Sequence, residues 1–520
     1  MYPVEHQRKF LFHDLAVPMI LAGVQLVVQV AFHGNYGYFR DELYYIACSN
    51  HLAFGYVDQP PLSIALLAVV RGIFGDSLYA IRFLSAAAVS VVMLLGALMT
   101  RRLGGGKGAQ ALTSLTIMMA PGLLGMGHYF SMNSFDVLFW TLGAYLLMTI
   151  FISDQPKYWV LFGICTGLGL LNKYSIGFLC LGLVAGLLLS SQRKHLINGW
   201  FWLGVLMTVL LTLPHLTWEI QNHYPSIEFM RNASELKNVK ISVPAFFFGQ
   251  FRDMNYVSAP IWLLGLGYFL FHPEGKKVRA LGWIYVTVLF IMVFGNAKVY
   301  YLAPIYPMMF AGGLVFTEKI IRRYTLSWPE PVYAALLVAM GFITLPFTVP
   351  VLPVETFIRY EQALGVVPHA EERSAVGVLP QYYADEFGWR EMVDSIGTAY
   401  KSLQPEERAQ CVIYARNYGE AGAIDFFGNK YGLPHALCAH NNYWFWGPGD
   451  RSGNVALIFG SAGTVEEPEV DLRKYYREVK LVTRTHSVFG MPYENGRPIF
   501  LCKGMSTTFQ HIWPTEHLFI

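Results

Sequence analysis

The sequence predicts a polytopic α-helical membrane protein with about 11 transmembrane helices, followed by an extracytoplasmic α/β domain. Only 14% of the 520 residues are charged, and the mean hydropathy is +0.38, whereas soluble domains carry about 25% charged residues. Aromatic residues make up 15% of the chain, which suits repeated crossing of membrane–water interfaces. The net charge of +3 and the absence of a long basic run argue against a nucleic-acid partner.

The apolar runs of the chain define the predicted spans. A helix crosses the hydrocarbon core in about 20 residues. The runs that qualify lie near residues 15–33, 78–100, 108–127, 131–152, 158–173, 174–190, 199–217, 256–271, 279–296, 302–318 and 331–350. The runs 158–173 and 174–190 are short, and Asn172 and Lys173 interrupt them.

Basic residues fall on every second connection between these spans, as the positive-inside rule requires of cytoplasmic loops. They are Arg8, Lys9, Arg101, Arg102, Lys107, Lys157, Arg193, Lys194, Lys276, Lys277, Arg279, Lys319, Arg322 and Arg323. This alternation predicts a multi-pass protein of the cytoplasmic (inner) membrane with a cytoplasmic N-terminus. Residues 1–350 then form the membrane domain, and the segments 34–77, 218–255 and 351–520 lie outside, with 351–520 as a periplasmic domain.

The first outer loop contains three adjacent ionisable residues among aromatics, in "GYFRDELYY" at 37–45. Residues 41–50 are predicted to form a short helix, and residues 60–75 a helix lying in the membrane interface. In one interpretation, Asp41 and Glu42 cap the short helix and Arg40 pairs with one of them. In the other, these charges take part in chemistry at the mouth of the helix bundle.

The outer segment 351–520 has frequent charges and apolar runs of strand length only. Residues 411–434 are predicted to form a strand, a turn and a helix, and "NVALIFG" and "RPIFLCKGM" two buried strands. The aromatic cluster "HNNYWFWGPGD" at 440–450 either stacks on sugar rings or packs in a core or interface. Cys411 and Cys438 could form a disulfide in an oxidising compartment, and the sequence leaves this open.

Several segments together resemble glycosyltransferase family 39, of the GT-C superfamily. They are "FRDELYYIACSNHLAFGYVDQPPLSIALLAVVRGIFGDSLYAIRFLSA", "MNSFDVLFW" and "AKVYYLAPIYP". That family holds protein O-mannosyltransferases and lipid A aminoarabinose transferases. The resemblance implies a membrane enzyme that transfers a sugar, with inversion, from a polyprenyl-phosphate carrier to an extracytoplasmic lipid, glycan or protein.

The resemblance also implies roles for individual residues. Asp41 matches the family's acidic position and is expected to act as general base, with Glu42 supporting it or facing a metal. The leaving phosphate needs cations or donors. The candidates for it are Arg82, Lys298 and Tyr301, although Lys298 could also simply extend to the membrane interface. The candidates for sugar or acceptor binding are Asp58, Gln59 and Asp136.

Two of these positions depart from the family pattern. Gln59 stands where aminoarabinose transferases carry a Lys before the Pro, so a phosphate contact made by that Lys is missing. Asp136 lies two residues from the position where the family's acid is expected. The sequence therefore predicts the class of enzyme and leaves the sugar and the acceptor open.

A bound divalent metal and a second class of function also remain as alternatives. His128, His215 and His223 are predicted near the outer face, but no HExxH-type spacing joins them to the outer carboxylates. A transporter or flippase of a lipid-linked or small substrate is the alternative function. It is disfavoured because the spans are nearly free of charge away from their ends and show no repeated halves.

Overall fold

The computed structural model describes residues 15–370, 372–461 and 466–520. The basic residues Arg8 and Lys9, predicted to be cytoplasmic, lie outside the described residues. The chain divides into two compact units. The first comprises residues 1–35, 74–216 and 240–351, and the second residues 36–73, 217–239 and 352–520. The loops 36–73 and 217–239 thus belong to the same unit as the C-terminal segment.

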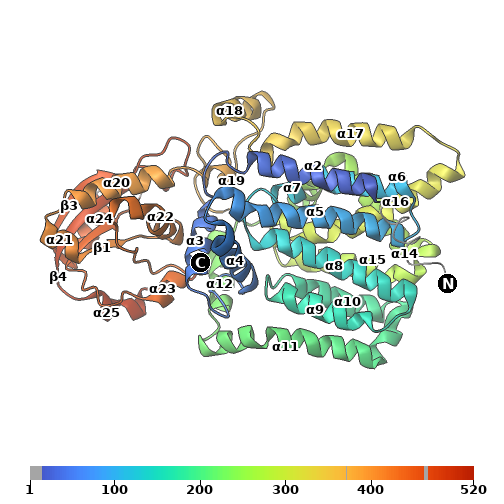
Figure 1. Cartoon of the computed structure of the whole chain (residues 1–520), viewed down its shortest axis with the longest axis horizontal. Helices are drawn as coiled ribbons and strands as arrows, with labels where there is room; N and C mark the ends of the chain where they lie inside the picture. The colour runs from blue at the N-terminus through green and yellow to red at the C-terminus, as the bar shows by residue number, and fades with distance from the viewer. Residues whose placement is uncertain (1–14, 371, 462–465) are drawn as a thin grey trace. The chain divides into compact units, whose positions relative to one another are not determined.

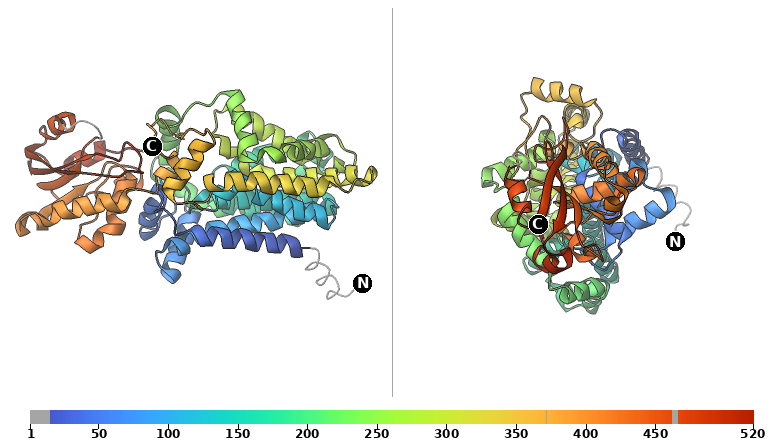
Figure 2. Two further views of the ribbon diagram at one scale, coloured as in Figure 1. Left: turned by 90° about the horizontal axis from the view of Figure 1, so that it is seen from above. Right: turned by 90° about the vertical axis from the view of Figure 1, so that its left-hand side faces the viewer.

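The first unit is a bundle of helices, and its long helices lie roughly parallel in both side views (Figures 1 and 2). Its helices are α2 (Ala16–Phe32), α5 (Leu78–Arg102), α6 (Lys107–Met118), α7 (Pro121–Gly125), α8 (Met132–Ser153), α9 (Tyr158–Leu170), α10 (Ile176–Leu188), α11 (Gly199–Gln221), α13 (Val243–Asp253), α14 (Ala259–Phe271), α15 (Arg279–Phe294), α16 (Tyr306–Arg323) and α17 (Pro329–Thr344). Every predicted span contains one of these helices. The prediction of a polytopic helical membrane protein is therefore confirmed.

Not every span is a full-length straight helix. Among the described residues, 6 helices are long and apolar enough to cross a membrane, or up to 8 if two bent pairs each count as one span. The bent pairs are Ile176–Leu188 with Ser191–Ile197, at 113°, and Val243–Asp253 with Tyr256–Phe271, at 97°. The helices α2 and α9 are shorter apolar helices at predicted positions. The predicted span 108–127 is divided: α6 ends at Met118, and the short helix α7 begins at Pro121.

Small residues allow close helix packing in this unit. A Cβ atom at Gly265 of α14 would collide with the Met309 carbonyl oxygen of α16, and one at Gly313 of α16 would collide with the Ile261 carbonyl oxygen. The two backbones therefore touch, as in membrane helix pairs where van der Waals packing replaces the hydrophobic effect.

The second unit contains a four-stranded sheet and a set of shorter helices. The strands are β1 (Cys411–Tyr414), β2 (Val455–Phe459), β3 (Tyr476–Arg484) and β4 (Pro498–Met505), in the order β1-β2-β4-β3. The helices are α3 (Arg40–Asn50), α4 (Leu62–Phe74), α12 (Pro225–Asn232), α18 (Val354–Ala363), α19 (Gln381–Ala384), α20 (Trp389–Lys401), α21 (Pro405–Gln410), α22 (Tyr418–Phe427), α23 (Asn442–Trp446), α24 (Glu466–Leu472) and α25 (Phe509–Ile512).

The predicted elements of the C-terminal segment are confirmed. Strand β1 is parallel to β2, with Cys411 opposite Val455, and β4 is antiparallel to both β2 and β3. Helix α22 follows β1, and a 3-10 turn then ends at Gly432, whose φ of 67° is left-handed. Cys411 and Cys438 are both buried and free, so the structure does not form the disulfide that the sequence left open.

Helix α22 packs directly on α3. A Cβ atom at Gly422 would lie 2.8 Å from the carbonyl carbon of Leu43, and one at Gly419 would lie 2.6 Å from the side chain of Arg40. A side chain at Gly422 would press on the α3 backbone, and one at Gly419 would displace the Arg40 side chain. This close approach places the first turn of α22 against the first turn of α3, which carries "RDE".

Candidate active site

Asp41 and Glu42 lie in the first turn of α3, and their side chains make different contacts. Glu42 is buried, and its Oε2 accepts a hydrogen bond from the backbone N–H of Phe39 at 2.9 Å. It therefore caps the helix, as one of the two interpretations predicts. The Asp41 side chain keeps 29% of its surface exposed. Its Oδ1 accepts a hydrogen bond from the hydroxyl of Tyr418, at the start of α22, at 2.9 Å.

Arg40 holds the carboxylates around Asp41 together. Its guanidinium lies 3.5 Å from Asp41 Oδ1, 3.0 Å from Glu372 Oε1 and 3.9 Å from Asp385 Oδ2. It also donates to the hydroxyl of Tyr493 at 2.6 Å. Burial raises the pKa of Asp385 to about 6, although the charge of Arg40 opposes the rise. Arg40 thus pairs with Asp41, as the capping interpretation predicts, and with two further acids.

Asp58 is a second carboxylate of the same network. The Tyr44 hydroxyl donates to Asp58 Oδ1 at 2.8 Å. Burial, with a smaller contribution from the negative charge of Asp41, raises the pKa of Asp58 to about 6, so the two carboxylates interact electrostatically. Next to it, Gln59 is fully buried, and neither Oε1 nor Nε2 has a hydrogen-bond partner among the described residues. A buried amide without partners is costly, which suits a residue that contacts substrate.

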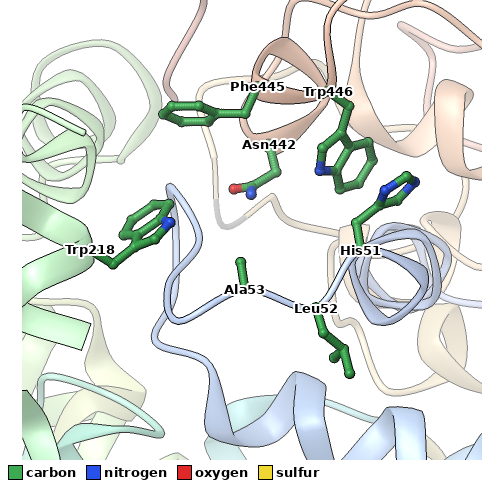
Figure 3. Close-up of a pocket in the computed structure, with 7 residues that line it drawn as sticks. All are labelled: His51, Leu52, Ala53, Trp218, Asn442, Phe445 and Trp446. Atoms are coloured by element: carbon green, nitrogen blue, oxygen red, sulfur yellow. The ribbon is translucent and has the colours of Figure 1, made fainter. Parts of the chain in front are cut away.

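A pocket of about 290 Å³ lies beside this network (Figure 3). Its lining comes from the loop after α3, from the C-terminal end of α11 and from α23, and all of these residues belong to the second unit. The residues are His51, Leu52, Ala53, Trp218, Asn442, Phe445 and Trp446. Asn442 Oδ1 accepts from the Val57 N–H at 2.7 Å and lies 3.4 Å from the hydroxyl of Tyr44. Tyr44 therefore connects the pocket to Asp58.

The first unit contains a separate polar cluster around Lys173. The Lys173 Nζ lies 3.6 Å from Asp136 Oδ2 and donates to Asn133 Oδ1 at 2.7 Å. It also lies 4.9 Å from the ring centre of Tyr301 and 5.5 Å from that of Tyr300. The structure thus brings together Asp136 and Tyr301, two of the predicted site residues, around a lysine that sequence reasoning missed. The signal was present, because an ionisable residue between two apolar runs is a functional candidate.

The two predicted phosphate-binding cations occupy different surroundings. Arg82 is fully buried in α5, and its Nη1 donates to the backbone oxygen of His33 at 3.1 Å and lies 3.4 Å from His128 Nε2. Lys298 precedes the 3-10 turn Val299–Ile305 and is partly buried. It takes part in none of the ion pairs formed by the described residues. The phosphate-binding roles of both residues stay predictions.

The described residues contain no group of three or more His, Cys, Asp or Glu side chains that could hold a metal ion. His215, one of the predicted histidines, instead lies 2.7 Å from the hydroxyl of Tyr174 through its Nε2. We therefore assign no metal ligands.

The comparisons with known proteins find similarity to glycosyltransferases in part of the sequence and in the fold. Residues 58–218 match the family model of dolichyl-phosphate-mannose-protein mannosyltransferases. This match begins at Asp58 and so does not include Asp41. The undecaprenyl phosphate-alpha-4-amino-4-deoxy-L-arabinose arabinosyl transferase 1 of Pseudomonas fluorescens strain Pf0-1 is 26% identical over 182 residues, which cover 34% of this chain and 31% of that protein.

A second transferase of this name, from Pseudomonas aeruginosa strain UCBPP-PA14, is 23% identical over 231 residues and 41% of each chain. The matches therefore span less than half the length of these relatives. The crystal structure of ArnT from Cupriavidus metallidurans bound to undecaprenyl phosphate is similar over 93% of this chain and 97% of that chain, with a TM-score of 0.59 and 15% identity. The chain thus shares the fold of this ArnT structure and is similar to glycosyltransferase family 39, as its motifs predict.

Proposed function

We propose that the protein is a membrane glycosyltransferase that moves a sugar from a polyprenyl-phosphate carrier to an extracytoplasmic acceptor. The fold, the sequence relatives and the partly exposed carboxylate of Asp41 support this function. The single observation that carries it is the network around Asp41. One partly exposed carboxylate is oriented by Tyr418 and Arg40, while the neighbouring acids are buried or paired.

The reaction is a single displacement at the anomeric carbon. The acceptor hydroxyl attacks that carbon and forms the new C–O bond, and its proton passes to the Asp41 carboxylate. The bond between the anomeric carbon and the phosphate oxygen breaks, and polyprenyl phosphate leaves with the electron pair. A single displacement inverts the anomeric configuration, and a base placed this way contributes about 10²–10⁴-fold in rate.

The leaving phosphate requires positive charge or hydrogen-bond donors that are already in place. Lys173 with Tyr301 supplies an ammonium group and a phenol in one cluster, and Arg82 and Lys298 are the further candidates. Asp136 holds Lys173 in place through the 3.6 Å ion pair. Gln59 and Asp58 are assigned to the sugar or the acceptor. A protein with this topology lies in the inner membrane, with residues 351–520 in the periplasm and the N-terminus in the cytoplasm.

The test is transfer of label from a panel of radiolabelled polyprenyl-phosphate sugars into membrane material. Wild type is compared with Asp41→Asn, and Asp450→Asn serves as the matched control at an exposed aspartate of the same unit. We expect transfer from one donor, a loss of about 100-fold or more in Asp41→Asn, and no change in Asp450→Asn. Equal transfer by wild type and Asp41→Asn would remove Asp41 from the chemistry. No transfer from any donor would favour the transporter alternative.

A further inference from the structure

The aromatic pocket beside Asp58 has the features of a carbohydrate site. We propose that it binds an uncharged pyranose ring of the acceptor, so that the acceptor is a glycan or glycolipid. This inference rests on the proposed function, since it names the acceptor class of the same enzyme. The pocket volume of about 290 Å³ suits one or two sugar rings.

The aromatic rings of the pocket are held in fixed orientations. The indole of Trp446 stacks on His51, with ring centres 4.3 Å apart and an interplanar angle of 22°, and meets Tyr443 edge-on at 4.5 Å. Phe445 stacks on Phe519 at 5.8 Å and lies 5.9 Å from Trp218. Flat apolar faces held this way can pack against the C–H face of a sugar at little entropic cost.

Asn442 supplies a polar group between the rings. Its side chain extends toward the space that Trp218, Phe445 and Trp446 surround (Figure 3). The Val57 N–H donates to its Oδ1 at 2.7 Å, which fixes the carboxamide and directs the Nδ2 donor away from Val57. A fixed amide donor beside aromatic faces is suited to a sugar hydroxyl.

The lining favours an uncharged sugar. None of the seven lining residues is a Lys, Arg, Asp or Glu. The one titratable residue among them is His51, and burial lowers its pKa, so the imidazole is neutral at physiological pH. A phosphorylated, acidic or amino sugar would find no countercharge among these residues.

The pocket is joined to the carboxylates through two hydrogen-bonding residues. The Tyr44 hydroxyl donates to Asp58 at 2.8 Å and accepts from the Asn442 backbone N–H at 3.3 Å. Only Tyr44 would therefore stand between Asp58 and a sugar ring held against Asn442, and Asp58 in turn interacts with Asp41. We therefore expect the pocket to hold the acceptor's sugar ring that lies next to the hydroxyl receiving the transferred sugar.

The test measures binding without any donor. The full-length protein is purified in a detergent that has no sugar headgroup, and its tryptophan fluorescence is titrated with methyl β-D-glucopyranoside and methyl β-D-galactopyranoside. Methyl glucuronoside and glucosamine 6-phosphate are the charged comparisons, and a short alkyl alcohol is the apolar one. The pocket variants are Trp446→Leu and Asn442→Ala. Phe54→Ala is the matched control, because Phe54 lies in the same loop, is 64% exposed and does not line the pocket.

We expect saturable binding of at least one neutral glycoside, about tenfold weaker in Trp446→Leu and unchanged in Phe54→Ala. Three outcomes would overturn the inference. The protein could bind no glycoside, it could bind one equally well in Trp446→Leu and Asn442→Ala, or it could prefer the charged sugars or the alcohol. If Asp41-dependent transfer persists in that case, the proposed function stands. Glycoside binding lost in the pocket variants, together with no transfer from any donor, would support the sugar site and reject the proposed function.

Discussion

The Tyr418 hydroxyl donates a hydrogen bond to Asp41 Oδ1 over 2.9 Å, although 377 residues separate the two in the sequence. This bond, with the ion pair to Arg40, orients a carboxylate that stays partly exposed. The C-terminal segment thereby supplies a positioning residue to the proposed base.

Tyr418→Phe should lower kcat/KM for sugar transfer about tenfold, because a hydrogen bond to a charged group contributes about 1.5–3 kcal/mol. The loss should fall mainly on kcat, since the tyrosine orients the base and makes no contact with the carrier lipid in the proposed reaction. Tyr475→Phe, at a residue 44% exposed, is the control. A variant with unchanged kcat would show that Asp41 needs no orienting hydroxyl.

Lys173 and Lys298 compete for the role of phosphate-binding cation, and paired substitutions separate them. Lys173→Met should abolish transfer, because it removes the ammonium held between Asp136 and Tyr301 and leaves a buried carboxylate without its partner. Lys298→Met should lower the rate by less than about tenfold, since a partly exposed lysine can act as an interfacial anchor. Transfer rates and membrane levels are measured for both.

A double substitution distinguishes charge loss from misfolding. Lys173→Met with Asp136→Asn removes both charges, so it should insert normally and still lack transfer. Recovery of transfer in the double variant would mean that Lys173 only neutralises Asp136. A larger loss in Lys298→Met than in Lys173→Met would restore Lys298 as the principal cation.

The buried glutamates Glu420 and Glu494 should make the stability of the protein depend on pH. Arg497 Nε lies 3.2 Å from Glu420 Oε1 and 3.3 Å from Glu494 Oε2, so one cation serves two carboxylates. Burial and the neighbouring Glu420 raise the pKa of Glu494. The folded state therefore binds a proton that the unfolded state has already lost, and stability falls as the pH rises above the ordinary glutamate range toward the raised pKa.

Glu494→Gln should flatten this dependence, because the amide stays neutral at every pH. The unfolding temperature of the full-length protein in detergent, measured between pH 5 and 8 for wild type and variant, checks it. The exposed Glu391→Gln is the control and should leave the wild-type slope unchanged. An unfolding temperature of wild type that rises with pH in this window would contradict the assignment.

Close packing of α22 on α3 predicts a specific glycine effect. Gly422→Ala should destabilise the protein by about 1–3 kcal/mol, because its Cβ would press on the backbone of Leu43 and force the helices apart. The same shift should move Tyr418 from Asp41 and lower transfer. Gly72→Ala in α4 meets nothing within 4 Å and should be neutral or slightly stabilising. Equal unfolding temperatures for the two variants would show that the helices can separate without cost.

The hydrophobic pattern of the sequence predicted most of the helices and buried strands of this protein. The apolar runs located the helices of the first unit, and the short helix of "RDELYYIACSN" follows from its acidic first turn. Strands β2 and β4 were predictable because they are apolar and buried. Strand β3 was not predicted, since it is an edge strand whose residues are mostly exposed, and its sequence "YREVKLVTR" lacks a buried run.

The candidate site residues were named from the sequence, and their roles stay predictions, whereas their hydrogen-bond and ion-pair partners could not be predicted. The resemblance singled out Asp41, and capping by Glu42 was one of the two interpretations of the adjacent charges. The pairing of Arg40 with Glu372 and Asp385 joins residues more than 300 positions apart, and no local periodicity encodes such a contact. For the same reason Lys173 was noted only as an interruption between two spans. Its contacts with Asp136 and Tyr301 depend on how the loop between α9 and α10 packs against α8 and the 3-10 turn Val299–Ile305.

The helix with Asp41 is made early in translation, whereas the residues that orient its carboxylate come from the last third of the chain. The hydrogen bond from Tyr418 to Asp41 can therefore form only after most of the chain has been synthesised. A chain that ends before residue 418 would contain Asp41 but lack the hydroxyl that donates to its carboxylate. In the proposed reaction, such a fragment would contain the base without the hydroxyl that orients it.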